Sequence, residues 1–212
     1  MHRANTLFWQ YCAAKYPRHF GAVRVLEVGS YDVNGSVRQF FPNPTEYVGV
    51  DWRPGPGVDH VSLAHKLKLP GRFDTVISAS MLEHDPFWIL SLPRMVRHMA
   101  EDGIMLLSWG AALNPPHELH TAPDGLFHCL PAQPVLDALK SIGLYVHEFR
   151  YEYRLPFLDR EAKRKLCRGC VAAVVFKDAK HASGARVIDK LSAPRGAGPT
   201  RDEAGRGTAG DS

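Results

Sequence analysis

The chain has 212 residues, 45% of them apolar, which is enough for one domain with a core of ordinary size. Its formal net charge of +4 is too small to argue for a nucleic-acid partner by itself, and no stretch approaches the roughly 20 consecutive apolar residues of a membrane helix. The first residues lack the basic start and apolar run of a signal peptide, so we expect a cytoplasmic protein without a membrane partner.

The first predicted element is a short amphipathic helix over residues 4–16, which ends at Pro17 and packs on or caps a sheet. Its apolar residues at helical spacing are Leu7, Phe8, Tyr11, Cys12 and Ala14.

The stretch from Arg24 to Asp51 has the layout of a nucleotide-binding βαβ unit. An apolar run rich in β-branched residues over 23–28 predicts a buried strand of a parallel sheet, bounded by Gly29. A loop of small residues, a short helical pattern and a second strand over 47–50 follow, and that strand ends on Asp51. In such a unit the ligand lies across the carboxyl ends of the strands, where Asp51 can accept hydrogen bonds from both hydroxyls of a ribose.

Strands and helices alternate further along the chain. More strands are predicted over 58–61, 73–80, 104–109, 145–153 and 169–176. A weak helix or turn is predicted over 63–69, and helices over 87–100 and 133–141. Pro93 should kink or restart the helix over 87–100, whose predicted apolar face is Phe87, Ile89, Leu90, Met95, Val96 and Met99.

This order of elements predicts an α/β fold. We expect a Rossmann-like, doubly wound sheet of seven strands, mostly parallel with one antiparallel edge strand, and helices on both faces. Residues 1–178 form this domain, with the N-terminal helix in residues 1–16. Ala, Gly, Arg, Ser and Thr dominate residues 179–212, so we expect a disordered tail with at most a helical turn near residues 187–191.

The sequence predicts no metal site. Cys167 and Cys170 have the C-x-x-C spacing, but a zinc site needs a second ligand pair, and a thioredoxin-type pair begins a helix whereas this one leads into an apolar strand. His117 and His120 lie in a long Pro-containing connection over 110–130, a length that is usually functional or mobile. They resemble half of a metal motif, but histidines in such a loop more often form loop hydrogen bonds.

Several motifs, in this order, resemble the class I S-adenosylmethionine-dependent methyltransferases, and in particular a small bacterial-type group with an LEVGS-x-x-x-NGS-x-R first loop. The resemblance covers about residues 25–145. Its motifs are Leu26-Glu27-Val28-Gly29-Ser30, Asn34-Gly35-Ser36-Val37-Arg38, Tyr47-Val48-Gly49-Val50-Asp51, Phe73-Asp74-Thr75-Val76-Ile77-Ser78, Met81-Leu82-Glu83-His84-Asp85-Pro86 and Pro123-Asp124-Gly125-Leu126.

The resemblance implies S-adenosylmethionine as the cofactor. Glu27 would hold its ammonium group directly or through water, and Gly29 would let the backbone approach the methionine moiety. Ser30 belongs to the same loop. Asp51 would bind the ribose diol, and Trp52 would pack on adenine.

Four further residues complete the predicted cofactor site. Ser80 and Met81 line the exit of the fourth strand, where an edge of the cofactor would pass. The family usually has an acid before an alanine after the third strand, to bond the adenine amino group. This chain has Leu63 before Ala64, so adenine would rely on the backbone and on packing.

Few catalytic groups are needed, because the sulfonium activates the methyl group and the enzyme mainly aligns the acceptor. His84, His117 and His120 are the candidate bases or acceptor-binding residues. The family's Asp-Tyr-x-Arg after the fifth strand is replaced by Thr121 without a clear arginine partner. A small-molecule or glycan acceptor is favoured over nucleic acid, because no Asn-Pro-Pro-Tyr base-flipping motif follows the fourth strand.

Two alternatives stay open. Leu63 and the altered acceptor loop suggest a non-catalytic, S-adenosylmethionine-binding or degenerate partner subunit. An NAD(P)-dependent oxidoreductase is disfavoured, because Tyr31 and Val33 stand where a dinucleotide-binding loop has further glycines. The oligomeric state does not follow from the sequence.

Overall fold

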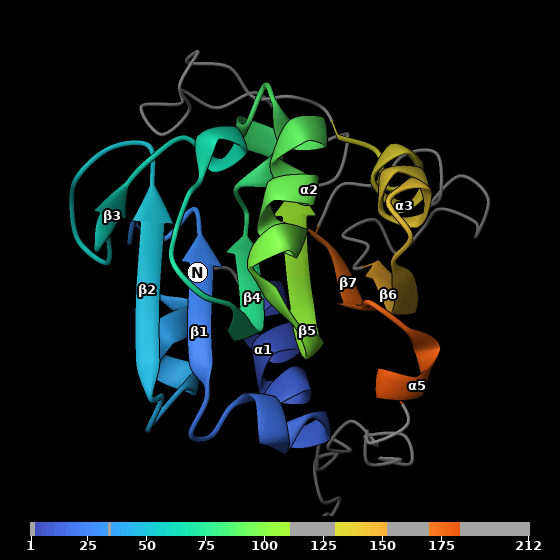
Figure 1. Cartoon of the computed structure of the whole chain (residues 1–212), viewed down its shortest axis with the longest axis horizontal. Helices are drawn as coiled ribbons and strands as arrows, with labels where there is room; N and C mark the ends of the chain where they lie inside the picture. Colours follow the sequence, from blue (N-terminus) through green and yellow to red (C-terminus); the bar gives the residue numbers. More distant parts are fainter. Residues whose placement is uncertain (1–2, 34, 111–129, 152–169, 183–212) are drawn as a thin grey trace, which may run out of the picture.

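In the computed structural model, residues 3–33, 35–110, 130–151 and 170–182 are described, and they form one seven-stranded sheet with helices on both faces (Figure 1). The strands, in chain order, are β1 (Arg24–Val28), β2 (Glu46–Asp51), β3 (His60–Val61), β4 (Phe73–Ala79), β5 (Met99–Gly110), β6 (Tyr145–Tyr151) and β7 (Cys170–Phe176). The α-helices are α1 (Arg3–Lys15), α2 (Trp88–His98), α3 (Ala132–Ser141) and α5 (Ala179–Ala182). Short 3-10 helices are η1 (Pro17–His19), η2 (Val37–Phe40), η3 (Ala64–Lys66) and η4 (Leu82–His84).

The predicted fold class is confirmed. The strand order is β3-β2-β1-β4-β5-β7-β6, and β1 to β5 pair in parallel. Strand β7 runs antiparallel to both β5 and β6, so the reversed strand lies one place in from the edge. Two apolar clusters flank the sheet, one under α1 and η2 and the other under α2 and α3. Helix α5 stands where the sequence predicts the start of a disordered tail, and residues 183–212 lie outside the described part.

Helix α1 packs on the sheet through a different face from the predicted one. Leu7 is 52% exposed, and Ala14 is also exposed. The buried positions are Asn5, Phe8, Trp9, Cys12 and Tyr16. Apolar residues surround most of this segment, so their spacing alone does not select the buried face. The buried face is the one that packs the large indole of Trp9 into the apolar cluster between α1 and the sheet.

The predicted apolar face of α2 is wrong for its first turn. Phe87, Ile89 and Leu90 are 45%, 58% and 56% exposed. The buried positions are Ser91, Leu92, Met95 and His98, a helical repeat on one side. The helix continues through Pro93. Ser91 can face inward because its hydroxyl donates to the buried carboxylate of Asp85.

Strand β5 begins earlier than the sequence predicts. Residues 101–103, which lie between the helix predicted over 87–100 and the strand predicted over 104–109, are instead part of β5, which pairs Phe73 with Met99 and Thr75 with Ile104. The pairing register shifts between these two pairs, so the extra residues form a bulge. A Cβ on Gly103 would lie 3.1 Å from the Asp74 carbonyl oxygen, so the bulge brings the two backbones close together.

A carboxylate fastens the edge strand β6 to α1. Glu148 accepts hydrogen bonds from the hydroxyls of Tyr11, at 2.7 Å, and Tyr16, and it pairs with Lys15 at 2.8 Å. Arg150 lies 3.3 Å from the same carboxylate and 3.6 Å from the Tyr11 ring centroid. Burial alone would raise the pKa of Glu148, but its hydrogen bonds lower it to about 2. The network therefore holds a charged glutamate between helix and sheet.

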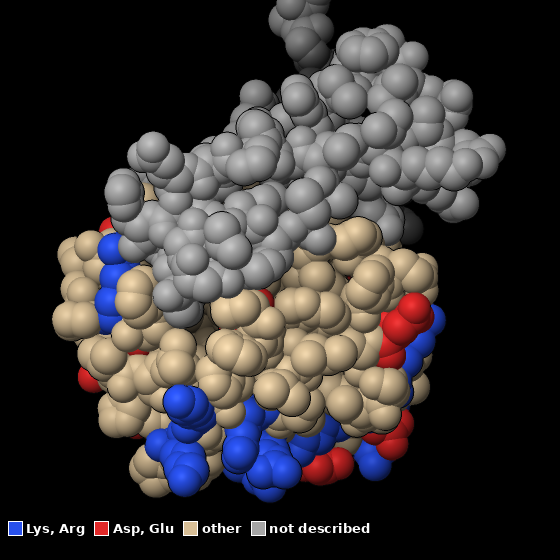
Figure 2. Space-filling model, turned by 90° about the horizontal axis from the view of Figure 1, so that it is seen from above, with Lys and Arg blue, Asp and Glu red and all other residues tan. Residues whose placement is uncertain are grey.

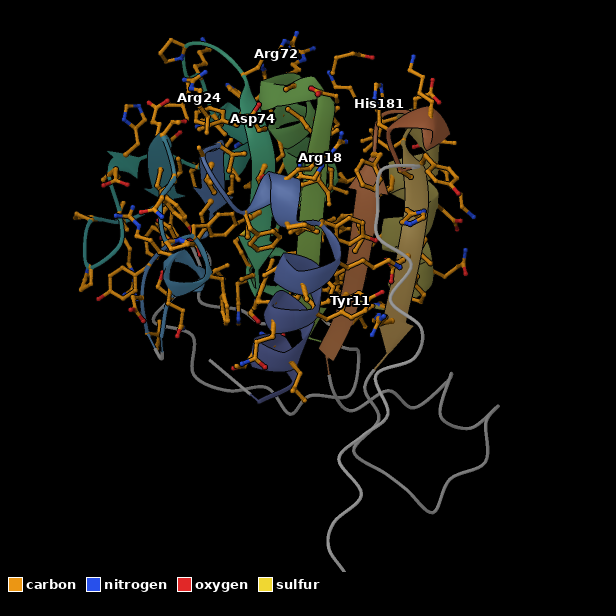
Figure 3. All side chains as sticks on the ribbon, turned by 90° about the horizontal axis from the view of Figure 1, so that it is seen from below. Tyr11, Arg18, Arg24, Arg72, Asp74 and His181 are labelled. Carbon is orange, nitrogen blue, oxygen red and sulfur yellow. The ribbon has the colours of Figure 1, made fainter. Side chains whose placement is uncertain are left out.

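Hydrogen bonds also join the segments at the amino ends of the parallel strands (Figure 3). The backbone N–H of Arg24 donates to the Asp74 carboxylate at 2.8 Å, and the Arg24 guanidinium donates to the Arg72 carbonyl at 2.5 Å. Arg18 donates to the carbonyl of His181 at 3.2 Å, which links η1 to α5. These contacts tie the sheet together at the edge opposite to the carboxyl ends of the parallel strands.

Candidate functional site

The two acids predicted to bind the cofactor lie on the same face of neighbouring strands. Strands β1 and β2 pair in parallel with Glu27 opposite Gly49. Because side chains alternate along a strand, Tyr47, Gly49 and Asp51 share the face of Glu27. Both acids therefore stand at the carboxyl ends of the strands, the upper edge of the sheet in Figure 1.

Glu27 is a buried carboxyl group with one strong partner. It is 4% exposed, and the Tyr47 hydroxyl donates to its Oε2 at 2.6 Å. The Arg38 guanidinium lies 4.4 Å from the Tyr47 ring centroid and pairs with Asp59 at 2.6 Å. Burial raises the pKa of Glu27 to about 7, against the opposing effects of Tyr47 and Arg38. A cation beside Glu27 would stabilise the charged form of this carboxyl group.

Sequence reasoning missed the roles of Tyr47, Arg38 and Asp59. Asp59 accepts from the Gly49 N–H at 2.7 Å, so it ties the segment before β3 to β2. Arg38 belongs to the NGS-x-R motif on which the resemblance rests, so an acidic partner for its side chain could have been expected. Arg38 pairs with Asp59 because the chain runs back alongside β2 at residue 59. No local sequence pattern predicts this pairing.

Asp51 is held by the loops that surround it. Its carboxylate accepts from the backbone N–H of Tyr31 at 3.2 Å and more weakly from that of Arg53 at 3.4 Å. Burial raises the pKa of Asp51 above its ordinary value, although these backbone donors oppose the rise. A carboxylate has about four acceptor sites, so Asp51 can accept further hydrogen bonds from a diol.

Gly29 has a reason to be glycine that the protein itself supplies. Its φ is +86°, and a Cβ would lie 2.4 Å from the Cβ of Met81. The sequence assigned this space to the ligand, whereas the structure places Met81 there. Two predicted cofactor residues, from the exits of β1 and β4, are thus in direct contact. Ser30 beside them is buried, and its hydroxyl has no hydrogen-bond partner among the described residues.

The loop after β2 folds back over the loop after β1. Asp32 N–H donates to the Pro56 carbonyl at 2.9 Å. The ring of Tyr31 lies so close to Gly55 that a Cβ there would be 2.1 Å from it, and the Arg53 guanidinium lies 3.9 Å from the ring centroid. Trp52 is half-buried in this loop. Tyr31, which argues against a dinucleotide in the sequence, therefore packs one loop on the other.

The exit of β4 is held in an uncommon backbone conformation by α1. Ser80 has a φ of +54°, and it is the one non-glycine residue of the described ranges with positive φ. Its N–H donates to the Ser108 carbonyl at 2.8 Å, and its hydroxyl accepts from Asn5 Nδ2 at 2.9 Å. Asn5 is buried, 75 residues away in sequence. Strain of this kind concentrates at functional sites, and sequence reasoning missed the contact of Asn5 with this strained residue.

Glu83 is the second buried glutamate of the site. It is 3% exposed in η4, and its Oε1 accepts from the Gly110 N–H at 2.7 Å. Its Oε2 has no partner within the part of the chain that the structure describes. Burial raises the pKa of Glu83 to about 7. Its neighbour His84, a predicted base, is half-buried, and its N–H donates to the Met81 carbonyl at 2.8 Å.

Leu63 and Ala64 stand beside the same edge. The Ser62 N–H donates to the Asp51 carbonyl at 2.8 Å, so the two residues follow directly on a contact with the end of β2. Both are half-buried, and Ala64 packs on the core cluster under α2. Their packing against adenine, which the resemblance implies, stays a prediction.

The remaining candidates cannot be placed. His117, His120 and Thr121 lie outside the described residues, as does Cys167. Within the described ranges, no group of three His, Cys, Asp or Glu side chains could hold a metal ion. No helix in those ranges has the length and apolarity to cross a membrane.

Comparison with known proteins identifies the fold. No protein-family model and no curated protein matches the chain. Among solved structures, the chain is similar to 1,6-didemethyltoxoflavin-N1-methyltransferase from Burkholderia thailandensis, crystallised with S-adenosylhomocysteine, at 16% identity and a TM-score of 0.55, over 78% of this chain and 76% of that one. It is also similar to the N-methyltransferase NodS from Bradyrhizobium japonicum, with S-adenosyl-L-homocysteine bound, at 15% identity and a TM-score of 0.53, over 81% and 85%.

A third similar structure is the cyclase SpnF, at 16% identity and a TM-score of 0.59, over 81% of this chain and 80% of that one. At such low identities these likenesses show the fold alone. The chain therefore has the Rossmann-like fold found in class I S-adenosylmethionine-dependent methyltransferases, with its two predicted acids at the end of the sheet where open α/β sheets bind ligands.

Proposed function

We propose that this protein is an S-adenosylmethionine-dependent methyltransferase acting on a small-molecule or glycan acceptor. The observation that carries the proposal is the placement of Glu27 and Asp51 on one face at adjacent strand ends, beside the Gly29 loop. A cofactor with an ammonium group at one end and a ribose diol at the other matches a buried carboxyl group and a partly satisfied carboxylate. The unpartnered hydroxyl of Ser30 offers a third polar group among the described residues.

Each residue then has a defined task in binding. Asp51 would accept hydrogen bonds from the ribose hydroxyls, since its backbone donors occupy only part of its capacity. Glu27 would bind the ammonium group, directly or through water, and become ionised in doing so. Trp52, Leu63 and Ala64 would enclose the adenine ring by packing. The bound cofactor would supply a methyl group that its sulfonium has already activated.

The exit of β4 would align the acceptor. Ser80 and Met81 are held there by Asn5 and by the contact with Gly29, so this segment is a rigid wall. His84 follows in the same segment and is the placed candidate for removing a proton from a hydroxyl or ammonium acceptor. His117 and His120 remain sequence-based candidates for acceptor binding.

A second function is favoured by one comparison. The cyclase SpnF shares this fold at the highest TM-score of the three structures described above, so the fold is not restricted to methyl transfer. In this alternative the chain binds S-adenosylmethionine without transferring its methyl group, as a non-catalytic or partner subunit. Binding of the cofactor together with no label transfer to any fraction of a cell extract would support this alternative.

Calorimetric titration with S-adenosylmethionine tests the proposal. The wild type should bind, and Asp51→Ala should bind about 10- to 100-fold more weakly, because a hydrogen bond to a charged group contributes roughly 1.5–3 kcal/mol. Asp137→Ala is the matched control, because Asp137 lies on α3, away from the ends of β1 and β2, and should leave the affinity unchanged. Equal affinity of Asp51→Ala and the wild type would reject the site. Tighter binding of reduced nicotinamide dinucleotide than of S-adenosylmethionine would favour the oxidoreductase.

A further inference from the structure

Three apolar side chains that the sequence assigns to the core lie on the outer side of α2. Phe87 is 45% exposed, Ile89 58% and Leu90 56%. We call these three residues the α2 apolar patch. The Phe87 ring centroid lies 4.4 Å from that of His65, so the patch continues onto the surface of η3. Contiguous exposed apolar patches on a protein surface mark interaction sites.

The segment that contains η3 runs along α2 and extends this surface. The Arg94 side chain donates to the His65 carbonyl at 3.1 Å. Towards the other end of the helix, the Leu69 N–H donates to His98 Nε2 at 3.1 Å. Leu67 between these contacts is buried in the core. Helix and segment therefore form one continuous surface.

The charged residues of this surface all have the same sign. Lys66, Lys68 and Arg97 lie on it together with the half-buried Arg94, and we call these four the basic strip. Residues 63–69 and 87–98 contain no Asp or Glu. Seen from above, Lys and Arg side chains gather along the side that carries α2 and η3 in Figure 1, next to an uncharged surface and beside some Asp or Glu side chains (Figure 2). Apolar side chains at one end of a helix are thus bordered by positive charge.

We propose that the α2 apolar patch and the basic strip bind the surface of an anionic lipid bilayer. The apolar side chains would enter the boundary between headgroups and acyl chains, and the basic strip would lie on the negative headgroups. Binding of this kind needs no spanning helix, so the hydropathy of the sequence does not bear on it. Nucleic acid would also neutralise the positive charge, but its phosphate backbone gives the three apolar side chains nothing apolar to contact.

Vesicle sedimentation with the full chain tests this proposal. The protein should bind vesicles of equal parts phosphatidylcholine and phosphatidylglycerol, and bind pure phosphatidylcholine vesicles far more weakly. The triple variant Phe87→Ser, Ile89→Ser and Leu90→Ser should lower the partition coefficient at least about tenfold, because it removes most of the apolar area that enters the bilayer. Arg97→Gln should lower it about fivefold, the effect of one basic charge near such a surface.

The chain offers a matched control. The triple variant Leu7→Ser, Val33→Ser and Val61→Ser removes three apolar side chains of 52%, 58% and 56% exposure that lie elsewhere, and it should bind vesicles like the wild type. Urea unfolding checks that both triple variants are folded. Equal losses in the two variants would overturn the proposal, as would the absence of vesicle binding by the wild type.

Two further measurements distinguish lipid binding from nucleic-acid binding and from the cofactor site. If the protein shifts transfer RNA in a gel to the same extent with and without the α2 apolar patch, and does not bind vesicles, the surface binds nucleic acid and the lipid proposal is wrong. The proposal does not depend on methyl transfer. Asp51→Ala should therefore bind vesicles normally, and a loss of vesicle binding in that variant would contradict the assignment to α2.

Discussion

The stability of Glu27→Gln relative to the wild type should rise between about pH 4 and about pH 8. Burial raises the pKa of Glu27 from 4.5 to about 7 in the folded protein. The folded state therefore holds this proton more tightly than the unfolded state. Between pH 4.5 and 7 it binds more protons, so the contribution of Glu27 to the free energy of unfolding falls as the pH rises. The shift corresponds to a loss of about 3 kcal/mol at about pH 8 relative to about pH 4.

The glutamine variant isolates this contribution. The amide oxygen of the introduced glutamine can still accept the hydrogen bond from the Tyr47 hydroxyl, and its buried N–H₂ group adds a cost of about 1–3 kcal/mol that does not change with pH. Other groups shape the wild-type curve. Burial also raises the pKa of Glu83 to about 7, and it lowers that of His19 to about 4, which has the opposite slope. Both are present in wild type and variant, so they cancel in the difference.

Urea unfolding, followed by tryptophan fluorescence in steps from about pH 4 to about pH 8, measures the difference. The free energy of unfolding of the variant minus that of the wild type should rise by about 3 kcal/mol across this range. Glu101→Gln, which removes an exposed carboxylate paired with Lys177, is the comparison variant for losing a carboxylate outside the core. Parallel curves for Glu27→Gln and the wild type would refute the reasoning. The variant should also bind S-adenosylmethionine more weakly, which would show a residue kept for binding at the expense of stability.

Three other experiments test the remaining contacts by thermal and urea unfolding. The stability that Glu148 contributes is present above pH 4.5 and is lost as the pH falls towards 2. The wild type should lose about 1–2 kcal/mol over that window, after discounting for solvent screening, and Glu148→Gln should not. Equal losses in both proteins would contradict the role of the Glu148 network. Asn5→Ala should destabilise by about 1–2 kcal/mol, and adding Ser80→Gly should restore part of this by relieving the positive φ; no restoration would argue against strain. Gly29→Ala should destabilise by at least about 2 kcal/mol, and Met81→Ala should not rescue it, because a Cβ remains at the point of collision.

The carboxyl-end acids follow from sequence pattern alone. A run of apolar, β-branched residues predicts β1, and the acid in it stands near its end, as Asp51 does in β2. Alternation of strands and helices predicts the sheet, and the closeness of the last two strands predicts one reversal. These features are local or periodic, so they can be read without knowing which elements meet.

Which face of each helix is buried could be decided only from its packing against the sheet. Helices α1 and α2 carry apolar residues around most of their circumference, so periodicity leaves more than one face available. For α2, the inward hydrogen bond between Ser91 and Asp85 and the packing of η3 select the buried side. Phe87, Ile89 and Leu90 are left outside in consequence.

The sequence by itself determined the order of most elements and the placement of an acid near the end of β1 and of β2, because apolar runs and the residues that end them follow one another along the chain. Only the tertiary structure decided that Asn5 holds Ser80 and that Glu83 holds Gly110. These partners are 75 and 27 residues apart. Glu83 meets Gly110 because the parallel strands β4 and β5 bring their carboxyl ends together, whereas Asn5 meets Ser80 because α1 packs on the sheet. Local propensity carries no information about such pairs, since the free energy that forms them comes from the packing of the whole sheet.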